Sequence, residues 1–231
     1  MTSAAPVIMV HGWAGSFDRT WVRSGLVDLV REAEREVVPY DLPGHGLSVK
    51  SHDPNDYADM AAHLLAAAEG TGRPVDAVGF SLGAITLLRA AIRSPQSFRR
   101  LVLAGIGDGV FHPHDPSRSE RIIAGLEGRA DPGDLTARIF GKIGNEAHND
   151  PRALAAVLRR PREMPIGRGD LATVVNRTLV VLGDKDFSAP ADQLVASLPD
   201  ARLVVIKGVD HFRTPESLEF VDSVLTFIAA S

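Results

Sequence analysis

A five-residue stretch, Gly-Phe-Ser-Leu-Gly at residues 79–83, constrains the fold of this chain more than any other feature. Residues 74–78 before it are mostly apolar, which favours a short buried strand. Residues 84–92 after it are rich in helix formers, with apolar side chains at helical spacing. A serine between a strand and a helix must adopt strained backbone angles, and the flanking glycines give the chain the room it needs. We therefore predict a nucleophile elbow centred on Ser81.

Apolar segments of strand length alternate with helical patterns along most of the chain. Strands are expected near residues 6–10, 36–41, 74–80, 100–104, 178–182 and 202–206. Helices are expected near residues 21–34, 53–69, 82–93, 192–197 and 215–229. This alternation is typical of an α/β fold whose parallel sheet carries helices on both faces. Because Pro39 has no amide hydrogen, the second of these strands fits an edge of the sheet.

Residues 105–177 interrupt the alternation and are too many for an ordinary connection. Asp-Pro pairs begin at Asp115, Asp131 and Asp150, and each places a capping residue before a proline suited to the first helical position. We expect a helix after each pair and a further short one near residues 170–175. The interval is therefore interpreted as a small helical cap, inserted into a core made of residues 1–104 and 178–231.

The overall composition excludes several classes of function. A formal net charge of −4 argues against nucleic acid as a partner. The chain has no cysteine, so disulfides, thiolate metal sites and a cysteine nucleophile are excluded. The apolar run at residues 7–10 is too short for a signal peptide or a membrane span, which predicts a cytoplasmic protein without a membrane partner. The oligomeric state is not indicated.

Polar residues with catalytic potential follow the predicted strands. A serine hydroxyl needs a base to react near neutral pH, and the base needs an orienting acid. Such groups gather at the carboxyl ends of parallel strands. The candidates at these ends are His11, Asp41, Ser81, Asp108, Asp184, Asp186 and His211. The chain order Ser81, Asp186, His211 suits a nucleophile, an acid and a base, and Asp108 remains the alternative acid because it follows a neighbouring strand.

With these residues in place, the chain resembles the α/β-hydrolase superfamily, and in particular its capped serine esterases and related acyl hydrolases. The resemblance covers nearly the whole chain and rests on five segments in the family's order: residues 11–12, 40–48, 79–83, 182–186 and 209–212. The family commonly has two strands ahead of the first of these segments, whereas only residues 1–5 precede the first strand here. The resemblance therefore implies the α/β-hydrolase fold with a mainly parallel sheet of about six strands. Phe80 and Ala84 depart from the family's usual elbow, which limits any transfer of substrate preference.

The resemblance also implies roles for individual residues. Ser81 would be the nucleophile, His211 the base and Asp186 the acid. The backbone N–H groups of Trp13 and Leu82 would form the oxyanion hole. The predicted walls of the substrate site are His11, Gly12, Phe140, Met164, Phe187 and Phe212.

The expected function is cleavage of a carboxylic ester or a related small acyl substrate through an acyl-enzyme, without a cofactor or a metal. His112 and His114 are two spaced histidines in a loop without further organised ligands, which favours solvated side chains over a metal site. The same triad also suits carbon–carbon bond, thioester or lactone hydrolysis and perhydrolysis. A ligand-binding protein without enzymatic activity is the other alternative, because fold alone does not establish catalysis.

Overall fold

The computed structural model describes residues 4–161 and 163–229. In these ranges the strands form one parallel sheet of six, in the order β2-β1-β3-β4-β5-β6. The strands are β1 (Val7–Val10), β2 (Val37–Val38), β3 (Val75–Phe80), β4 (Phe98–Ala104), β5 (Arg177–Gly183) and β6 (Ala201–Ile206). The predicted fold class and the expected six-stranded sheet are confirmed.

The edge strand β2 is shorter than predicted. Its pairing with β1 ends at Val38, which lies opposite Ile8, and Pro39 follows without an amide hydrogen to extend the ladder. The expected strand at residues 36–41 is therefore reduced to two residues, although it does lie at the edge of the sheet as predicted.

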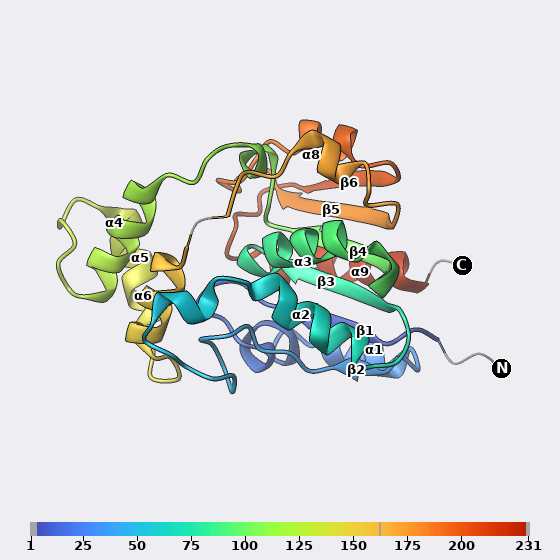
Figure 1. Ribbon diagram of the computed structural model, residues 1–231, viewed down its shortest axis with the longest axis horizontal. Helices are drawn as coiled ribbons and strands as arrows, with labels where there is room; N and C mark the ends of the chain where they lie inside the picture. The colour runs from blue at the N-terminus through green and yellow to red at the C-terminus, as the bar shows by residue number, and fades with distance from the viewer. Residues whose placement is uncertain (1–3, 162, 230–231) are drawn as a thin grey trace.

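Helices cover both faces of the sheet (Figure 1). The core helices are α1 (Leu26–Glu32), α2 (Met60–Glu69), α3 (Leu82–Arg93), α8 (Asp192–Ser197) and α9 (Leu218–Ala229). Successive side chains of a strand point to opposite faces. Ile8 and Val10 pack in a core cluster with residues of α2, α3 and α8, whereas Val7 and Met9 pack in a second cluster with α1 and α9. Two apolar cores thus hold the sheet between two layers of helices.

Three of the predicted helices are each divided in the structure. The pattern at residues 21–34 becomes a π-helical turn at Asp18–Val22 and the helix α1, because Gly25 between them has a φ of 79° that a helix does not continue through. The pattern at residues 53–69 becomes a 3₁₀ turn at Pro54–Tyr57 and the helix α2, which begins at a new cap, Asp59. The pattern at residues 215–229 becomes a 3₁₀ turn at Thr214–Glu216 and the helix α9, because Ser217 between them is extended. Periodicity alone did not indicate any of these breaks.

Between β4 and β5, the described residues hold the helices α4 (Pro116–Leu126), α5 (Leu135–Gly144), α6 (Pro151–Arg159) and α7 (Arg168–Leu171). The first three gather beyond one end of the sheet, on the left of Figure 1. Asp115 and Asp150 cap α4 and α6 as predicted, by accepting hydrogen bonds from backbone N–H groups of the first turn. Asp131 instead accepts from Gly133 N in a turn, and α5 begins after Asp134. The short helix expected at residues 170–175 lies earlier, as α7.

A search of the described helices finds none whose length and apolar character would let it cross a lipid bilayer.

Candidate active site

Ser81 lies on a strained turn between β3 and α3. Its φ of 52° and ψ of −116° are unusual for a residue with a side chain. The chain packs closely on both sides of the turn. A Cβ at Gly83 would lie 2.2 Å from the carbonyl oxygen of Val10, and one at Gly79 would lie 2.7 Å from the Cα of Ala84. Only glycine fits at these two positions, which explains the spacing of the motif in physical terms.

Three side chains from separate turns meet beside this elbow. His211 follows β6, and its Nε2 lies 3.0 Å from the Ser81 Oγ. On the other side of the ring, Nδ1 lies 2.9 and 3.0 Å from the two carboxylate oxygens of Asp186, which follows β5. Both His211 and Asp186 are buried. With Nδ1–H donating to Asp186, Nε2 is left to accept the Ser81 proton, which is the arrangement of a nucleophile, a base and an orienting acid.

The electrostatics of Asp186 suit the acid role. Burial on its own would raise the pKa of Asp186, but the hydrogen bond and the charge of His211, together with hydrogen bonds from Ser188, lower this pKa overall. A carboxylate that stays ionised can hold the imidazole in one tautomer and stabilise its protonated form.

Asp108 and Asp184, the other acidic candidates, are engaged elsewhere. The Asp108 carboxylate is buried and accepts a hydrogen bond from Leu194 N at 2.9 Å, so it holds the start of α8. Asp184 accepts from Gly208 N at 2.7 Å in the turn after β6. The geometry therefore favours Asp186 over both of them.

The expected oxyanion donors lie on either side of Ser81. Leu82 is the first residue of α3, and the first N–H groups of a helix have no carbonyl partner in a preceding turn. Trp13 follows Gly12, and Gly12 lies against the elbow. A Cβ added to Gly12 would be 3.3 Å from the Cβ of Ser81. Two backbone N–H groups beside one nucleophile can stabilise a developing oxyanion.

His11 supports this loop and does not line the cavity beside Ser81. Its ring is fully buried, its Nδ1 lies 2.8 Å from Gly12 O, and its Nε2 lies 3.1 Å from Leu42 N. Asp41 in turn accepts hydrogen bonds from Phe17 N and Leu47 N. Burial would raise the pKa of Asp41, but the His11 ring and these two N–H groups together lower it. His11 and Asp41 thus shape the loops around the site without reaching the nucleophile.

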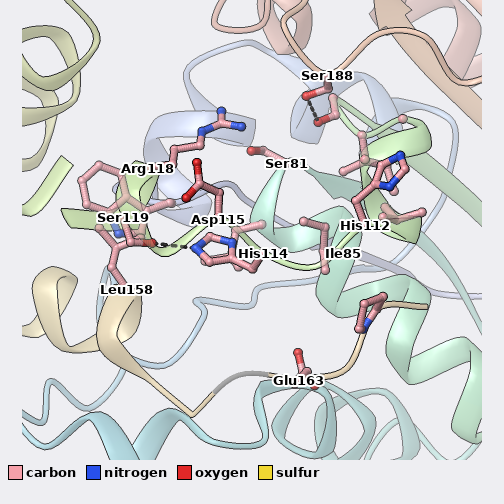
Figure 2. A pocket seen from close by; sticks show the side chains of 18 of the residues that line it. Ser81, Ile85, His112, His114, Asp115, Arg118, Ser119, Leu158, Glu163 and Ser188 are labelled. Carbon is pink, nitrogen blue, oxygen red and sulfur yellow. Dashed lines mark hydrogen bonds between the residues drawn. The ribbon is translucent and has the colours of Figure 1, made fainter. Parts of the chain in front are cut away.

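A cavity of about 510 Å³ opens at Ser81, between the carboxyl ends of the strands and the helices of residues 105–177 (Figure 2). Of the predicted wall residues, Phe140 and Phe187 line it, as do Trp13 and Leu82. Phe212 does not line it, but packs behind these walls with ring centroids 5.4 Å from Phe140 and 6.3 Å from Phe187. Gly12 also does not line the cavity. Its backbone instead packs closely against Ser81.

Met164 departs from its predicted place. Its side chain is 80% exposed and is not part of the cavity lining, and its carbonyl oxygen accepts a hydrogen bond from Arg89. In its place the cavity has polar wall residues that sequence reasoning missed, namely Arg89, His112, His114, Asp115, Arg118, Ser119, Arg160, Glu163 and Ser188. Most of them come from residues 105–177, where no motif separates a polar residue facing a cavity from one facing solvent.

A second buried histidine predicts how stability depends on pH. His45 is fully buried, its Nδ1 lies 3.0 Å from Pro43 O, and burial, with the nearby His11, lowers the pKa of His45 from 6.5 to about 3. The unfolded chain binds a proton at His45 below pH 6.5, whereas the folded protein does not until about pH 3. The free energy of unfolding should therefore be highest above pH 6.5 and fall as the pH falls through this window, by about 2 kcal/mol from this residue at pH 5.

Urea unfolding at pH 7 and pH 5 checks this result in the wild type and in His45→Asn. The variant keeps an amide that can donate to Pro43 O but has no titrating group, so its loss between the two pH values should be smaller by about 2 kcal/mol. Equal losses in the two proteins would contradict the prediction.

Comparison with known proteins agrees with the fold. A model of the alpha/beta hydrolase family matches residues 7–222. Among characterised relatives, 2-hydroxy-6-oxononadienedioate/2-hydroxy-6-oxononatrienedioate hydrolase 2 of Pseudomonas putida is 28% identical over 97% of this chain and 88% of its own length. The dihydrolipoyllysine-residue acetyltransferase component of the acetoin cleaving system of Pseudomonas putida is 25% identical over 96% of this chain, which spans 63% of that protein.

A solved structure is similar over its full length. The crystal structure of NosK from Streptomyces actuosus superposes with a TM-score of 0.72 at 26% identity and covers 97% of both chains. The family model, which extends over nearly all of the chain, and the six-stranded sheet with its serine elbow support one assignment. The chain belongs to the alpha/beta hydrolase family.

Proposed function

We propose that the protein is a serine hydrolase that cleaves a carboxylic ester or a related small acyl substrate through an acyl-enzyme. The observation that carries the proposal is the continuous chain of hydrogen-bond distances from Ser81 Oγ through the His211 ring to the Asp186 carboxylate. In such a chain the imidazole removes the hydroxyl proton as the oxygen attacks, and the buried carboxylate stabilises the imidazolium that results.

In the proposed mechanism, Ser81 Oγ bonds to the substrate carbonyl carbon while its proton moves to His211 Nε2. The backbone N–H groups of Trp13 and Leu82 stabilise the oxyanion of the tetrahedral intermediate. The bond to the leaving group then breaks, and His211 returns the proton to that group. Water then attacks the acyl carbon while His211 takes its proton. The bond from the acyl carbon to Ser81 Oγ breaks, and His211 returns the proton to Oγ, which releases the acid and restores the hydroxyl.

Residues 105–177 would act in this mechanism as the cap over the site. Their helices contact the loop that carries the expected oxyanion donor. The Trp13 indole Nε1 lies 3.3 Å from Leu154 O, and Asn149 Nδ2 donates to Ala14 O at 3.2 Å. Leu154 and Ala14 also share a small apolar cluster. Docking of the cap would thus help to hold the backbone of residues 13–14 in place.

Carbon–carbon bond hydrolysis is the second candidate, and the similarity to the Pseudomonas putida hydrolase over nearly the whole chain favours it. The same nucleophile and base serve both reactions, so the two activities can be distinguished only by measuring which substrate is hydrolysed. Comparing the hydrolysis of p-nitrophenyl butyrate with that of a vinylogous 1,5-diketone distinguishes the two activities.

Labelling with a fluorophosphonate tests the proposed function directly, because it reports the reactive serine whatever the natural substrate is. We expect stoichiometric labelling of the wild type with loss of p-nitrophenyl butyrate hydrolysis, and neither labelling nor hydrolysis in Ser81→Ala. Ser119→Ala is the matched control, because Ser119 is a serine of the same cavity whose Oγ pairs with His114 Nε2 at 2.9 Å. Absence of labelling in the wild type, or labelling that persists in Ser81→Ala, would contradict the proposal.

A further inference from the structure

Among the described residues, three arginines line the cavity that opens at Ser81, and two of them are engaged by neighbouring groups. Arg89 Nε lies 3.0 Å from the Glu163 carboxylate, and another nitrogen of Arg89 donates to the carbonyl of Met164. Arg160 donates to Val157 O at 2.7 Å. The third, Arg118 of α4, differs from both.

The Arg118 guanidinium lies over an aromatic wall of the catalytic centre. Its Cζ is 4.6 Å from the centroid of the Phe187 ring, and the Phe187 ring lies 4.2 Å from the His211 ring. The Phe187 ring is therefore close to both Arg118 and His211. Figure 2 shows Arg118 and Ser81 around the same cavity. A guanidinium stacked on a ring keeps its N–H donors, which lie in its own plane, available to a ligand.

Within residues 4–161 and 163–229, no hydrogen bond or ion pair engages the Arg118 guanidinium, although its side chain lies at the cavity. The two carboxylates that influence it electrostatically, Asp186 and Asp115, have other partners. Asp186 is bonded to His211, and Asp115 accepts hydrogen bonds from the N–H and the hydroxyl of Ser117 at the start of α4. The cavity therefore contains a cation whose donors have no acceptor among the residues that the structure describes.

Arg118 is exposed overall. Desolvation of its guanidinium beside the cavity, together with the neighbouring Arg121, lowers the pKa of Arg118, but a guanidinium keeps its charge in proteins. A carboxylate is the ligand that matches such a group, because two parallel N–H donors fit its two oxygens. A phosphate dianion would call for a second available cation, and the other two arginines of this cavity are already engaged.

We propose that Arg118 binds a carboxylate of the substrate, so that the protein acts on esters or related acyl compounds that carry a free acid group beside the bond attacked by Ser81. This inference rests on the proposed function and specifies its substrate class. Half-esters of dicarboxylic acids are the simplest compounds with this chemistry.

Paired esters that differ only in one charge test the inference. One pair is p-nitrophenyl hydrogen adipate and its neutral methyl ester, which place the charge on the acyl part. The other is 4-butyryloxybenzoate and its methyl ester, which place it on the leaving group. For at least one pair, we expect the wild type to have the higher kcat/KM with the charged ester. In Arg118→Gln, the charged-to-neutral ratio of kcat/KM should fall by about 10- to 100-fold, because a hydrogen-bonded ion pair is worth about 1.5–3 kcal/mol.

Arg121→Gln is the matched control. Arg121 lies on the same helix and is exposed, but it forms an ion pair with Asp134, with Nε 2.6 Å from a carboxylate oxygen, and it does not line the cavity. In Arg121→Gln, the charged-to-neutral ratio of kcat/KM should stay within about twofold of the wild type. This result would show that the effect comes from direct contact with Arg118 and not from the total positive charge of α4. Arg118→Lys should recover part of the lost ratio, because an ammonium keeps the charge without the two-pronged geometry.

Binding to Ser81→Ala gives a readout that needs no turnover. Calorimetry with monomethyl adipate should show binding to this variant and a loss of about 10-fold or more when Arg118→Gln is added. If the wild type hydrolyses the neutral esters but the ratio is the same in Arg118→Gln, the inference is overturned while the proposed function stands. If no ester is hydrolysed but the Arg118-dependent binding is present, the proposed function fails and the carboxylate site remains.

Discussion

Replacing His211 with glutamine is expected to lower kcat for p-nitrophenyl butyrate by about 10⁴- to 10⁶-fold, the range seen when a serine hydrolase loses its base. His211 Nε2 lies 3.0 Å from Ser81 Oγ and has to take the proton as the oxygen attacks. A glutamine amide fills a similar space and can form hydrogen bonds, but it does not accept a proton near neutral pH. Steady-state kinetics at pH 7.5, with thermal unfolding of the same preparation, measure the effect.

His63→Gln is the control for this substitution, because His63 is an exposed residue of α2, on the part of that helix that faces solvent. Its kcat should stay within about twofold of the wild type. If His211→Gln were folded and kept more than a tenth of the wild-type kcat, His211 would not be the base, and the mechanism proposed for Ser81 would be wrong.

Asp186→Asn is expected to lower kcat by about 10⁴-fold while leaving the fold intact. An asparagine at this position would donate its amide hydrogen to His211 Nδ1 instead of accepting from it. The imidazole would then carry its hydrogen on Nε2 and could not take the Ser81 proton. The neutral amide would also fail to stabilise the imidazolium. Kinetics with the same ester measure the loss.

Asp108→Asn decides between the two acids that the order of residues along the chain left open. The Asp108 carboxylate accepts a hydrogen bond from Leu194 N, and an asparagine oxygen can accept the same bond. We expect kcat within about threefold of the wild type and a change in the free energy of unfolding of about 1 kcal/mol or less. A large loss of kcat in Asp108→Asn with little loss in Asp186→Asn would reverse the assignment.

The sheet could be predicted because its information is local. Short apolar segments separated by helical patterns indicate parallel strands, and all six are present with boundaries shifted by a few residues. The serine elbow was predictable for the same reason. Its glycines at positions 79 and 83 are required by contacts with Ala84 and Val10, so the spacing of the motif itself encodes the turn.

The prediction was weaker where a contact joins distant parts of the chain. Asp131 was expected to begin a helix, but the cap of α5 is Asp134, because both residues offer the same side chain to a backbone N–H and only packing selects one. Met164 was expected in the cavity wall and is instead exposed. The sequence did not indicate a role for Arg118, because an arginine on an amphipathic helix is normally solvated.

The sequence by itself determined the α/β layering, the strained serine and the placement of Ser81, Asp186 and His211 at one edge of the sheet, because each of these depends on residues that are neighbours along the chain or on the shared edge of a parallel sheet. Only the tertiary structure decided that the Asp186 carboxylate faces His211 while that of Asp108 holds α8. It also brought the Arg118 guanidinium onto Phe187. The direction of a side chain and the groups that it contacts depend on how distant elements pack. A local sequence pattern does not contain this information.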